Sequence, residues 1–507
     1  MHSKIYSATT VGIDAHLVEV EVDLAFGMIQ FCIVGLPDKA IKESKDRIKA
    51  ALKNSGVRLP ERAITVNLAP ATLKKEQILF DVPIAIAILQ AAKQLDLSDE
   101  FIHESLFLGE VSLDGQIRPV RGVLSIAHSA SNFGKKRLII PKANTQEASL
   151  IKNIEIIGVE SLVELIAYLR GEKSIEPINS TFDLHLDKIQ KHPLDFEDVK
   201  GQLQAKRALQ ISAAGRHNIL FVGPPGSGKT MLAKRLASIL PPMSFDEVIQ
   251  TTKLYSVAGM LGNNSLLTHR PFRSPHHTIS QAGLVGGGTI PRPGEISLAH
   301  CGILFLDELT EFNRCTLEVL REPLENQKVL ISRATCSVEF PSSFLLIAAL
   351  NPCPCGYFGD KKKCLCSPTQ VSKYLSKLSG PLLDRIDLHV NVPAINYDEL
   401  KNTNFAIKSS SEMYKDVDAA VQLQENRLPG LRNAFMASDQ VEKYCKLSNE
   451  AEQILKLAFD RIGLSMRGYH KILKIARTIA DLQASDIIDR FHIQEAILYR
   501  SLDQKLQ

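Results

Sequence analysis

The 507-residue chain is long enough for two to four domains, and its apolar fraction of 45% with a charged fraction of 23% is typical of a globular protein. The net charge of +4 is too small to indicate a nucleic-acid partner by itself, although a near-neutral total can contain a local basic stripe. No apolar run resembles a signal peptide or spans a bilayer, and nine cysteines without a secretion signal favour reduced thiols or metal ligands, so we expect a cytoplasmic protein with no membrane partner.

The chain is predicted to contain an N-terminal domain, a linker, a central domain and a C-terminal domain. Residues 1–170 mix short alternating strands such as LVEVEVDL with helical stretches, which predicts an α+β domain. Residues 171–192 lose periodicity and are predicted to form a linker. In residues 193–395 near-continuous apolar strands alternate with helices, which indicates an α/β domain with a parallel sheet covered on both faces. Residues 396–507 show almost only helical periodicity and are predicted to form a helical domain.

The stretch NILFVGPPGSGKTMLAKRLASIL (218–240) predicts a strand, a loop and a helix in succession. Its loop matches the phosphate-loop pattern G-x-x-x-x-G-K-[ST], in which backbone N–H groups and the positive end of the helix bind phosphates. In this pattern Lys229 is expected to reach the β- and γ-phosphates of ATP, and the Thr230 hydroxyl is expected to bind Mg²⁺. The predicted nucleotide-binding residues of the loop are Gly223, Pro224, Pro225, Gly226, Ser227, Gly228, Lys229 and Thr230.

The stretch GILFLDELTEF (302–312) places two acidic residues directly after a buried strand. Ligands of open α/β sheets bind at the carboxyl ends of the strands, so Asp307 and Glu308 are expected at the same edge as the phosphate loop. We expect Asp307 to hold Mg²⁺ through its water shell and Glu308 to polarise the attacking water. The alternative is that the two acids only cap a helix.

A third apolar strand, 344–350, ends at Asn351. If this strand lies between the phosphate-loop strand and the acidic strand, the Asn351 side chain faces the γ-phosphate. An amide there can orient the attacking water without adding a negative charge that would repel phosphate. Taken alone, Asn-Pro is a common start of a turn, and that interpretation remains open.

Four cysteines follow Asn351, in two C-x-C pairs. Residues i and i+2 of an extended chain point to the same side, so each pair is able to face one ion. Four thiolates suit a closed tetrahedral structural zinc site, although C-x-C is tighter than the usual C-x₂₋₄-C spacing. The alternative is four reduced surface thiols. The candidate zinc ligands are Cys353, Cys355, Cys364 and Cys366.

Together these motifs resemble the AAA+ ATPases, and specifically the magnesium-chelatase-like YifB/ComM family. The resemblance extends over nearly the whole chain, and it implies a central AAA+ ATPase core, a C-terminal helical lid, and a ring, usually a homo-hexamer, with ATP between subunits. The stretches that carry it are FRSPHHTIS (272–280), RPGEISLAHCGILFLDEL (292–309), LREPLE (320–325), NPCPCGYFGD (351–360), LSGPLLDRIDLHV (378–390) and RTIADL (477–482).

The resemblance implies two further catalytic arginines. Arg385, in LLDRID, matches the arginine finger that enters the neighbouring subunit's site and stabilises charge on the transferring phosphoryl group. Arg467, at the start of an amphipathic helix, matches the second sensor of the lid, which contacts the γ-phosphate. Read alone, DRID is equally compatible with a surface salt bridge.

The resemblance also implies two insertions that line the ring pore: a second-helix insert at 251–288 and a hairpin at 327–340. Basic residues in glycine-rich loops are able to follow a phosphate backbone, and without an aromatic platform any contact with DNA is expected to be independent of sequence. Ordinary solvated loop charge is the alternative. The candidate DNA contacts are Arg270, Arg273, His276, His277, Lys328 and Arg333.

Residues 1–170 resemble the proteolytic domain of Lon-type proteases, a ribosomal-S5-domain-2-like fold, which uses a Ser nucleophile and a Lys base. Pro83 stands where the serine belongs and Leu124 replaces the lysine, with Ser125 nearby. We therefore expect a non-proteolytic interaction or ring-forming platform. The stretch 77–79 (Gln-Ile-Leu) also departs from the small Gly-Ser pair that the family usually has there.

Three functions remain to be compared. The first is an ATP-driven DNA motor, and the resemblance implies branch migration or helicase activity in recombination during natural transformation. The second is a chelatase-like or protein-remodelling ATPase that acts on a partner protein. The third, an ATP-dependent protease, is disfavoured by the missing Ser–Lys pair.

Overall fold

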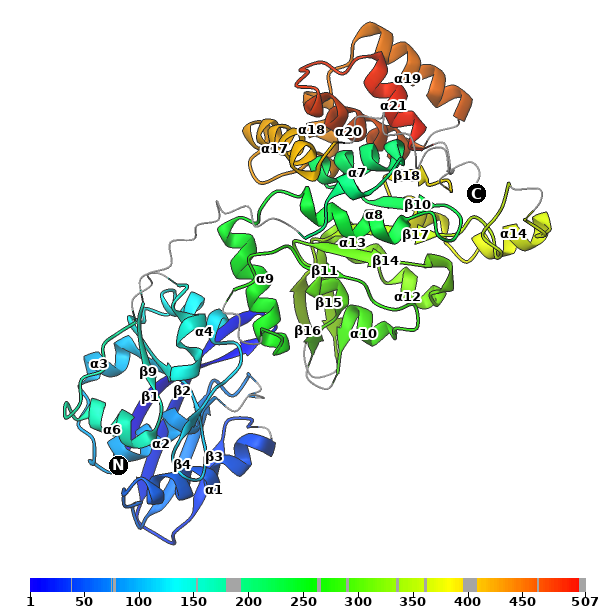
Figure 1. The fold of residues 1–507 in the computed structure, drawn as a ribbon. Coiled ribbons are helices and arrows are strands. Elements are labelled where there is room, and N and C mark those ends of the chain that lie inside the picture. The colour runs from blue at the N-terminus through cyan, green and yellow to red at the C-terminus, as the bar shows by residue number, and fades with distance from the viewer. Residues whose placement is uncertain are drawn as a thin grey trace. The chain divides into compact units, whose positions relative to one another are not determined.

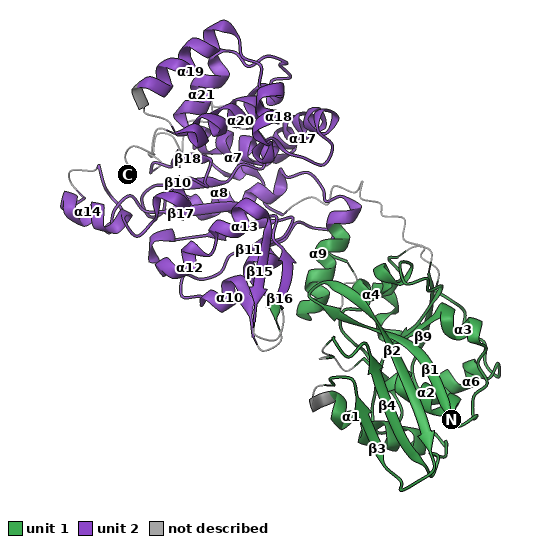
Figure 2. Cartoon of the chain, turned by 180° about the vertical axis from the view of Figure 1, so that it is seen from behind, with its two compact units in different colours: residues 1–185, 248–267, 289–292 green, residues 186–247, 268–288, 293–507 purple. Residues whose placement is uncertain are grey.

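The computed structural model forms two compact units, each with its own apolar core (Figures 1 and 2). Unit 1 comprises Met1–His185, Val248–Leu267 and Thr289–Arg292, and unit 2 comprises Leu186–Glu247, Thr268–Gly288 and Pro293–Gln507. The structure describes all residues except 38, 74, 76–78, 152–153, 179–192, 262–265, 289–290, 334–336, 360–362, 395–407, 463–464 and 501–507. Most of the predicted linker, the first two residues of the 77–79 departure and the tip of the predicted hairpin therefore lie outside the described residues.

Unit 1 is a mixed α/β unit built on a four-stranded sheet in the order β1 (His2–Val11), β2 (Asp14–Ala25), β4 (Ala63–Ala69), β3 (Phe31–Val34). The first three strands pair antiparallel, and β3 runs parallel to β4 at the edge. Residues on β2 alternate between buried and more exposed, which places one face of the sheet against the core. Helix α2 (Asp81–Ala91) supplies that core, since all but one of its residues are buried.

A second, parallel sheet of unit 1 has the order β5 (Ser105–Phe107), β8 (Arg137–Pro141), β9 (Glu155–Val159). The remaining elements are α1 (Lys39–Asn54), α3 (Asp99–Glu104), β6 (Glu110–Val111), β7 (Ile117–Arg118), α4 (Val123–Ala130), η1 (Lys142–Asn144), α5 (Thr145–Ala148) and α6 (Leu162–Leu169).

Unit 1 also receives most of a helix from the middle of the chain, α9 (Phe245–Ala258). Ile249 is part of the unit 1 core and Leu266 packs against it. The Ser256 hydroxyl accepts a hydrogen bond from the Gly122 N–H at 3.1 Å and donates to the Glu147 carboxylate at 2.5 Å. Apolar packing and buried hydrogen bonds thus make this segment part of unit 1, so the units do not follow chain order.

Unit 2 contains a five-stranded parallel sheet in the order β11 (Phe272–Arg273), β14 (Ile303–Leu306), β17 (Leu345–Leu350), β10 (Ile219–Val222), β18 (Leu388–Asn391). The three central strands, β14, β17 and β10, are buried along their whole length. This confirms the predicted parallel sheet. It also places β17 between β10 and β14, which is the arrangement that the hypothesis for Asn351 required.

The helical C-terminal region is also confirmed. Its helices α17 (Ser410–Arg427) and α20 (Met466–Leu482) pack with α7 (Leu203–Gly215) in the same apolar core as the sheet. A Ser409–Glu412 capping box starts α17 and the Ser465 hydroxyl caps α20. The other helices of this region are α18 (Ser438–Tyr444), α19 (Asn449–Ile462) and α21 (Arg490–Leu498), with the short η5 (Asn433–Phe435).

A two-stranded antiparallel ribbon, β15 (Lys328–Ser332) and β16 (Ser337–Pro341), lies between β14 and β17 in sequence. Across the described ranges, the structure has no helix of the length and apolarity needed to span a membrane. The remaining elements after residue 195 are η2 (Phe196–Asp198), α8 (Lys229–Arg235), η3 (Leu236–Ser238), α10 (Gln281–Val285), β12 (Gly286–Gly287), β13 (Arg292–Pro293), α11 (Glu295–Leu298), η4 (Leu309–Glu311), α12 (Arg314–Glu318), α13 (Arg321–Asn326), α14 (Pro368–Leu375) and α15 (Gly380–Leu383).

Candidate functional site

The phosphate loop joins the buried strand β10 to helix α8 at the carboxyl edge of the sheet. Gly226 (φ +75°) and Gly228 (φ +90°) adopt left-handed backbone conformations that glycine enters without steric cost. A Cβ at Gly223 would lie 2.1 Å from the Val392 carbonyl oxygen, so that glycine is required by close approach of the backbone. The Ser227 hydroxyl is buried and has no hydrogen-bond partner among the described residues. These features fit a loop shaped to hold phosphate oxygens.

Lys229 lies between this loop and Asn351. Its ammonium donates hydrogen bonds to the carbonyl oxygens of Gly223 at 2.7 Å and Pro224 at 2.9 Å, and to Asn351 Oδ1 at 3.2 Å. Burial lowers the pKa of Lys229, and the charges of Asp307 and Glu308 oppose that shift. The Lys229 side chain and the Asn351 amide therefore meet at the end of β17, within reach of one bound phosphate.

Thr230 and Asp307 come from different elements and meet directly. The Thr230 hydroxyl donates to Asp307 Oδ2 at 2.7 Å, while Asp307 Oδ1 accepts from the Glu308 N–H at 2.9 Å. A hydroxyl and a carboxylate are the hard oxygen ligands that Mg²⁺ prefers. The donor set at this edge of the sheet therefore fits a magnesium–nucleotide pair.

Glu308 follows with an unusual backbone and a largely exposed side chain. Its φ is +51°, and its side chain is 56% exposed. It occupies the N-cap position of η4, but its side chain makes no capping hydrogen bond, which argues against the helix-capping alternative. The carboxylate instead faces His277, whose Nδ1 lies 3.4 Å from Glu308 Oε2.

The contact between His277 and Glu308 was missed by sequence reasoning, which assigned His277 to a DNA-contacting loop. It arises because β11, which precedes His277, pairs in parallel with β14, which precedes Glu308. The His277 ring is held by His276, with ring centroids 4.1 Å apart, and by the edge of Phe312 at 6.4 Å. The available signal was the short FRSPHH stretch, had it been recognised as the edge strand beside the acidic strand.

His277→Ala is expected to lower the ATP turnover rate roughly tenfold, below the ~10²–10⁴-fold effect of losing a general base outright, and to leave KM for ATP unchanged. The physical reason is that Glu308 loses the ring that orients its exposed carboxylate. Steady-state ATPase kinetics measure the effect. His277→Asn, which retains a donor, is expected to recover part of the loss; equal rates for His277→Ala and wild type would contradict the positioning role.

The two arginines implied by the resemblance form no hydrogen bonds with the phosphate loop in the described part of the chain. Arg385 pairs with Glu325 of α13 and donates to the Pro381 carbonyl, so the salt-bridge alternative is realised within the chain. Arg467 is exposed at the start of α20 and has no hydrogen bond or ion pair with any described residue. Within the described part of one chain, neither arginine bonds to residues 223–230. Their catalytic roles therefore remain predictions that need a neighbouring subunit or a lid movement.

The segment that carries Arg385 is joined to helix α20 of the C-terminal region. Lys471 Nζ lies 3.0 Å from Asp387 Oδ1 and also donates to the Asp384 carbonyl oxygen. His217 Nδ1 contacts the other Asp387 oxygen at 3.3 Å. Burial by itself would raise the pKa of Asp387, but Lys471 and His217 outweigh it and hold that pKa well below its ordinary value. This ionised junction fixes α20 to the segment before β18.

The predicted DNA contacts fall into two groups. Arg270 binds the Glu247 carboxylate and the Pro241, Pro242 and Cys301 carbonyls, and Arg273 forms a two-pronged ion pair with Glu295 at 2.6 Å. These two guanidinium groups are thus already paired inside the chain. His276 bonds to Thr278, and Lys328 pairs with Glu339 on the exposed face of the β15–β16 ribbon. Arg333 is exposed and unpaired with respect to the described residues.

A buried histidine beside Arg270 gives a prediction for stability. Burial, with the nearby Arg216 charge, lowers the pKa of His300 to about 4, and the His300 Nδ1 accepts the Ser343 N–H at 3.0 Å. Because this folded pKa is below the unfolded value of about 6.5, the contribution is present above about pH 6.5 and is lost as pH falls toward 4, by about 3 kcal/mol. Urea unfolding between pH 7 and 4.5 measures it.

His300→Gln removes this titration and is expected to flatten the acid dependence of the urea midpoint over that range. The same dependence in His300→Gln and wild type would contradict the assignment.

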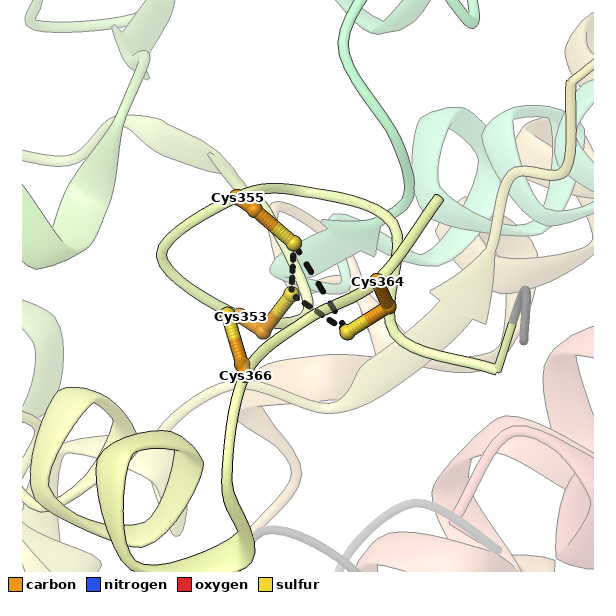
Figure 3. A group of neighbouring side chains, drawn as sticks. All are labelled: Cys353, Cys355, Cys364 and Cys366. Atoms are coloured by element: carbon orange, nitrogen blue, oxygen red, sulfur yellow. Dashed lines mark hydrogen bonds between the residues drawn. The ribbon is translucent and has the colours of Figure 1, made fainter. Parts of the chain in front are cut away.

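The four predicted zinc ligands are brought together. All four sulfur atoms lie within 4.8 Å of one another, and Cys353 is fully buried (Figure 3). The Tyr357 N–H, with the neighbouring thiols, lowers the pKa of Cys355 to about 6. The cluster begins two residues after Asn351, which places it beside the phosphate site.

Comparisons with known proteins agree with this architecture. Residues 195–400 match the family described as magnesium chelatase, subunit ChlI, residues 20–144 match subunit ChlI of Mg-chelatase, and residues 407–500 match the C-terminal part of subunit ChlI. Competence protein ComM from Haemophilus influenzae is 44% identical over 506 residues, covering 99% of this chain and 98% of that protein. The uncharacterized protein YifB from Escherichia coli is 41% identical over 505 residues, with the same coverage. An uncharacterized Mycobacterium tuberculosis protein is 39% identical over 484 residues, or 94% of each chain.

Proposed function

Because the chain belongs to the YifB/ComM family of magnesium-chelatase-like AAA+ ATPases, we propose that it is an ATP-hydrolysing, ring-forming motor that acts on DNA. The observation that carries the proposal is the convergence of Lys229, Thr230, Asp307 and Asn351 at one edge of the parallel sheet, with Glu308 directly after Asp307. Lys229 bonds to Asn351, and Thr230 bonds to Asp307, across three neighbouring strands.

Each residue has a stated role in hydrolysis. The backbone of residues 223–228 and the Lys229 ammonium bind the phosphates, and Thr230 with Asp307 holds Mg²⁺, which neutralises phosphate charge when bound. Glu308 accepts the proton of the attacking water, and the Asn351 amide orients that water without adding charge. Arg467 of the lid contacts the γ-phosphate from the other side.

The site is completed by a second copy of the chain. Phosphoryl transfer needs positive charge on the side away from Lys229, and Arg385 of the next subunit supplies it in the proposed homo-hexamer. Release of Arg385 from Glu325, or a shift of both together, then accompanies assembly. The Lys471–Asp387 junction ties this arginine segment to the lid.

DNA is the proposed partner, through the exposed face of the ribbon β15–β16, whose alternate residues are buried. Arg333 and Lys328 are exposed on that ribbon, and a backbone-led contact of this kind is independent of sequence. Its proposed role is branch migration, or a related helicase activity, during natural transformation in the cytoplasm. The similarity to a protein named as a competence protein supports only the link to transformation.

Unit 1 is proposed to be a Lon-like domain without proteolytic chemistry. Pro83 is buried on α2, and Leu124 and Ser125 are fully buried on α4. A buried proline and leucine at the matching positions are unable to act as nucleophile and base. A platform for subunit or partner contacts is the remaining role.

A protein-remodelling ATPase is the second candidate. It is favoured by the match to the magnesium chelatase subunit and by the pairing of Arg270 and Arg273 inside the chain, which leaves fewer basic groups for DNA.

Steady-state ATPase assays with single-stranded, duplex and branched DNA separate the two candidates. A DNA motor is stimulated by at least one of these forms, and the stimulation weakens steeply as salt is raised. Arg333→Glu is expected to lose the stimulation and retain basal hydrolysis, whereas Lys415→Glu, the same charge change on an exposed face of α17, is expected to retain both. No stimulation by any DNA form would contradict the DNA motor and favour protein remodelling.

We also propose that the four clustered cysteines hold a structural zinc ion.

A further inference from the structure

The cysteine loop (residues 352–367, described except for 360–362) has the geometry of a single-ion site. The separations among the sulfurs of Cys353, Cys355 and Cys364 are 3.3, 3.6 and 3.9 Å, and Figure 3 shows these three sulfurs facing one another. Zinc–sulfur bonds of about 2.3 Å in a tetrahedron place sulfurs about 3.8 Å apart. With Cys366, four thiol ligands complete the coordination of zinc, so the site is closed to water and structural.

One end of the cysteine loop is continuous with the catalytic edge of the sheet. Cys353 follows Asn351 by two residues, and Asn351 comes directly after β17. The Gly223 N–H donates to the Leu350 carbonyl at 3.2 Å, so the last residue of β17 is bonded to the first residue of the phosphate loop. Any movement of Cys353 is thus transmitted to Asn351, whose amide contacts Lys229.

The middle of the cysteine loop packs against the phosphate loop. The Gly356 N–H donates to the Cys353 carbonyl at 2.9 Å, and Gly356 has a φ of +85°. A Cβ at Gly356 would lie 2.4 Å from Pro225 Cδ. The turn that presents Cys353 and Cys355 is therefore in van der Waals contact with the phosphate loop, and its position limits where that loop can lie.

The other end of the cysteine loop leads to the acidic strand. Ser367, directly after Cys366, forms a capping box with Gln370 and starts α14. Lys377, two residues after that helix, donates to the Thr310 carbonyl oxygen at 3.0 Å. Thr310 is two residues after Glu308, so the second pair of cysteines is linked to the turn that carries the catalytic glutamate.

We propose that zinc bound by these four cysteines fixes the positions of Asn351, Pro225 and the turn after Glu308, so that ATP hydrolysis depends on an ion that never contacts the nucleotide. The inference rests on the proposed ATPase function and adds a positioning metal site to it. Without the ion, the two halves of a long loop lose their strongest link and retain weaker contacts, such as the Lys363 ammonium over the Tyr357 ring. Small displacements at a catalytic centre cost about 10²-fold in rate.

The test begins with metal analysis of the full-length protein purified under reducing conditions, which is expected to show about one zinc ion per chain. A Cys364→Ser/Cys366→Ser double variant is expected to lose the zinc and to hydrolyse ATP about 10- to 100-fold more slowly. Cys315→Ser, which removes an exposed cysteine outside the cluster, is the matched control and is expected to change neither reading.

Two glycine substitutions test the inference even if the cysteine variant does not fold. Gly356→Ala retains all four ligands but places a Cβ against Pro225, whereas Gly359→Ala imposes the same left-handed strain (φ +96°) with nothing within 4 Å. Both are expected to retain zinc, and only Gly356→Ala is expected to lose ATPase activity well beyond the control.

The inference would be overturned if the wild-type protein contained no zinc, or contained iron instead of zinc. It would also be overturned if zinc-stripped protein or the Gly356→Ala variant hydrolysed ATP at the wild-type rate. Zinc-bound protein that binds no nucleotide would overturn the proposed function as well, and the metal count tells these failures apart.

Discussion

Glu308→Gln is expected to bind ATP as tightly as the wild type and to hydrolyse it at least ~100 times more slowly. Glu308 stands at the end of β14, next to Asp307, with an exposed carboxylate and no capping role. The glutamine preserves the size of the side chain and its approach to His277 but is unable to accept a proton from water. Binding is measured with a fluorescent ATP analogue, and turnover by phosphate release.

Glu311→Gln is the matched control, because Glu311 is three residues further on and its carboxylate lies 3.8 Å from Lys377 Nζ rather than at the phosphate site. It is expected to turn over ATP at close to the wild-type rate. Appreciable residual hydrolysis by Glu308→Gln would assign the base to another group.

Arg385→Ala is expected to reduce hydrolysis by about 10³-fold or more, because an arginine finger supplies its charge to the site of the neighbouring subunit. Its effect should then be rescued in trans. Mixing Arg385→Ala with Glu308→Gln gives rings in which some intact Glu308 sites adjoin an intact Arg385, so the mixture is expected to be more active than either variant alone.

Two variants distinguish this role from the ion pair that Arg385 forms with Glu325. Glu325→Gln removes the pair and leaves the finger, so it is expected to retain turnover. Arg490→Ala removes an arginine of α21 that also forms an ion pair within the chain, and it is expected to have little effect. A small loss in Arg385→Ala, with no gain on mixing, would show that the salt bridge is its whole role.

Local pattern was sufficient for the parts of the site that follow one another in sequence. The glycines, Lys229 and Thr230 are placed by a strand, a tight loop and a helix, and Asp307 by the end of an apolar strand. The hypothesis for Asn351 depended on strand order, which sequence did not give, and the observed place of β17 between β14 and β10 confirms that order.

Contacts between segments that lie far apart in the chain could not be predicted from the sequence. His277 meets Glu308 only because the very short strand β11 pairs with β14, and two residues give too little periodicity to be recognised as a strand. Arg270 and Arg273 looked like free loop charges because their partners, Glu247 and Glu295, lie more than twenty residues away. Helix α9 joins unit 1 through buried contacts, and no sequence pattern that marks a domain boundary predicts this.

The cysteine spacing predicted a metal cluster but not its place in the molecule. That Gly356 lies against Pro225 depends on how the turn folds back over the sheet edge, and no periodic pattern describes such a turn.

Equilibrium titration of the Glu308→Gln protein with a fluorescent ATP analogue and Mg²⁺ is the sharpest check of the ATP site, because slow turnover allows binding to be measured alone. We expect saturable, magnesium-dependent binding that is lost in Lys229→Ala, whose ammonium connects the phosphate loop to Asn351. Absence of nucleotide binding, or binding unchanged by Lys229→Ala, would show that the edge of this sheet is not an ATP site.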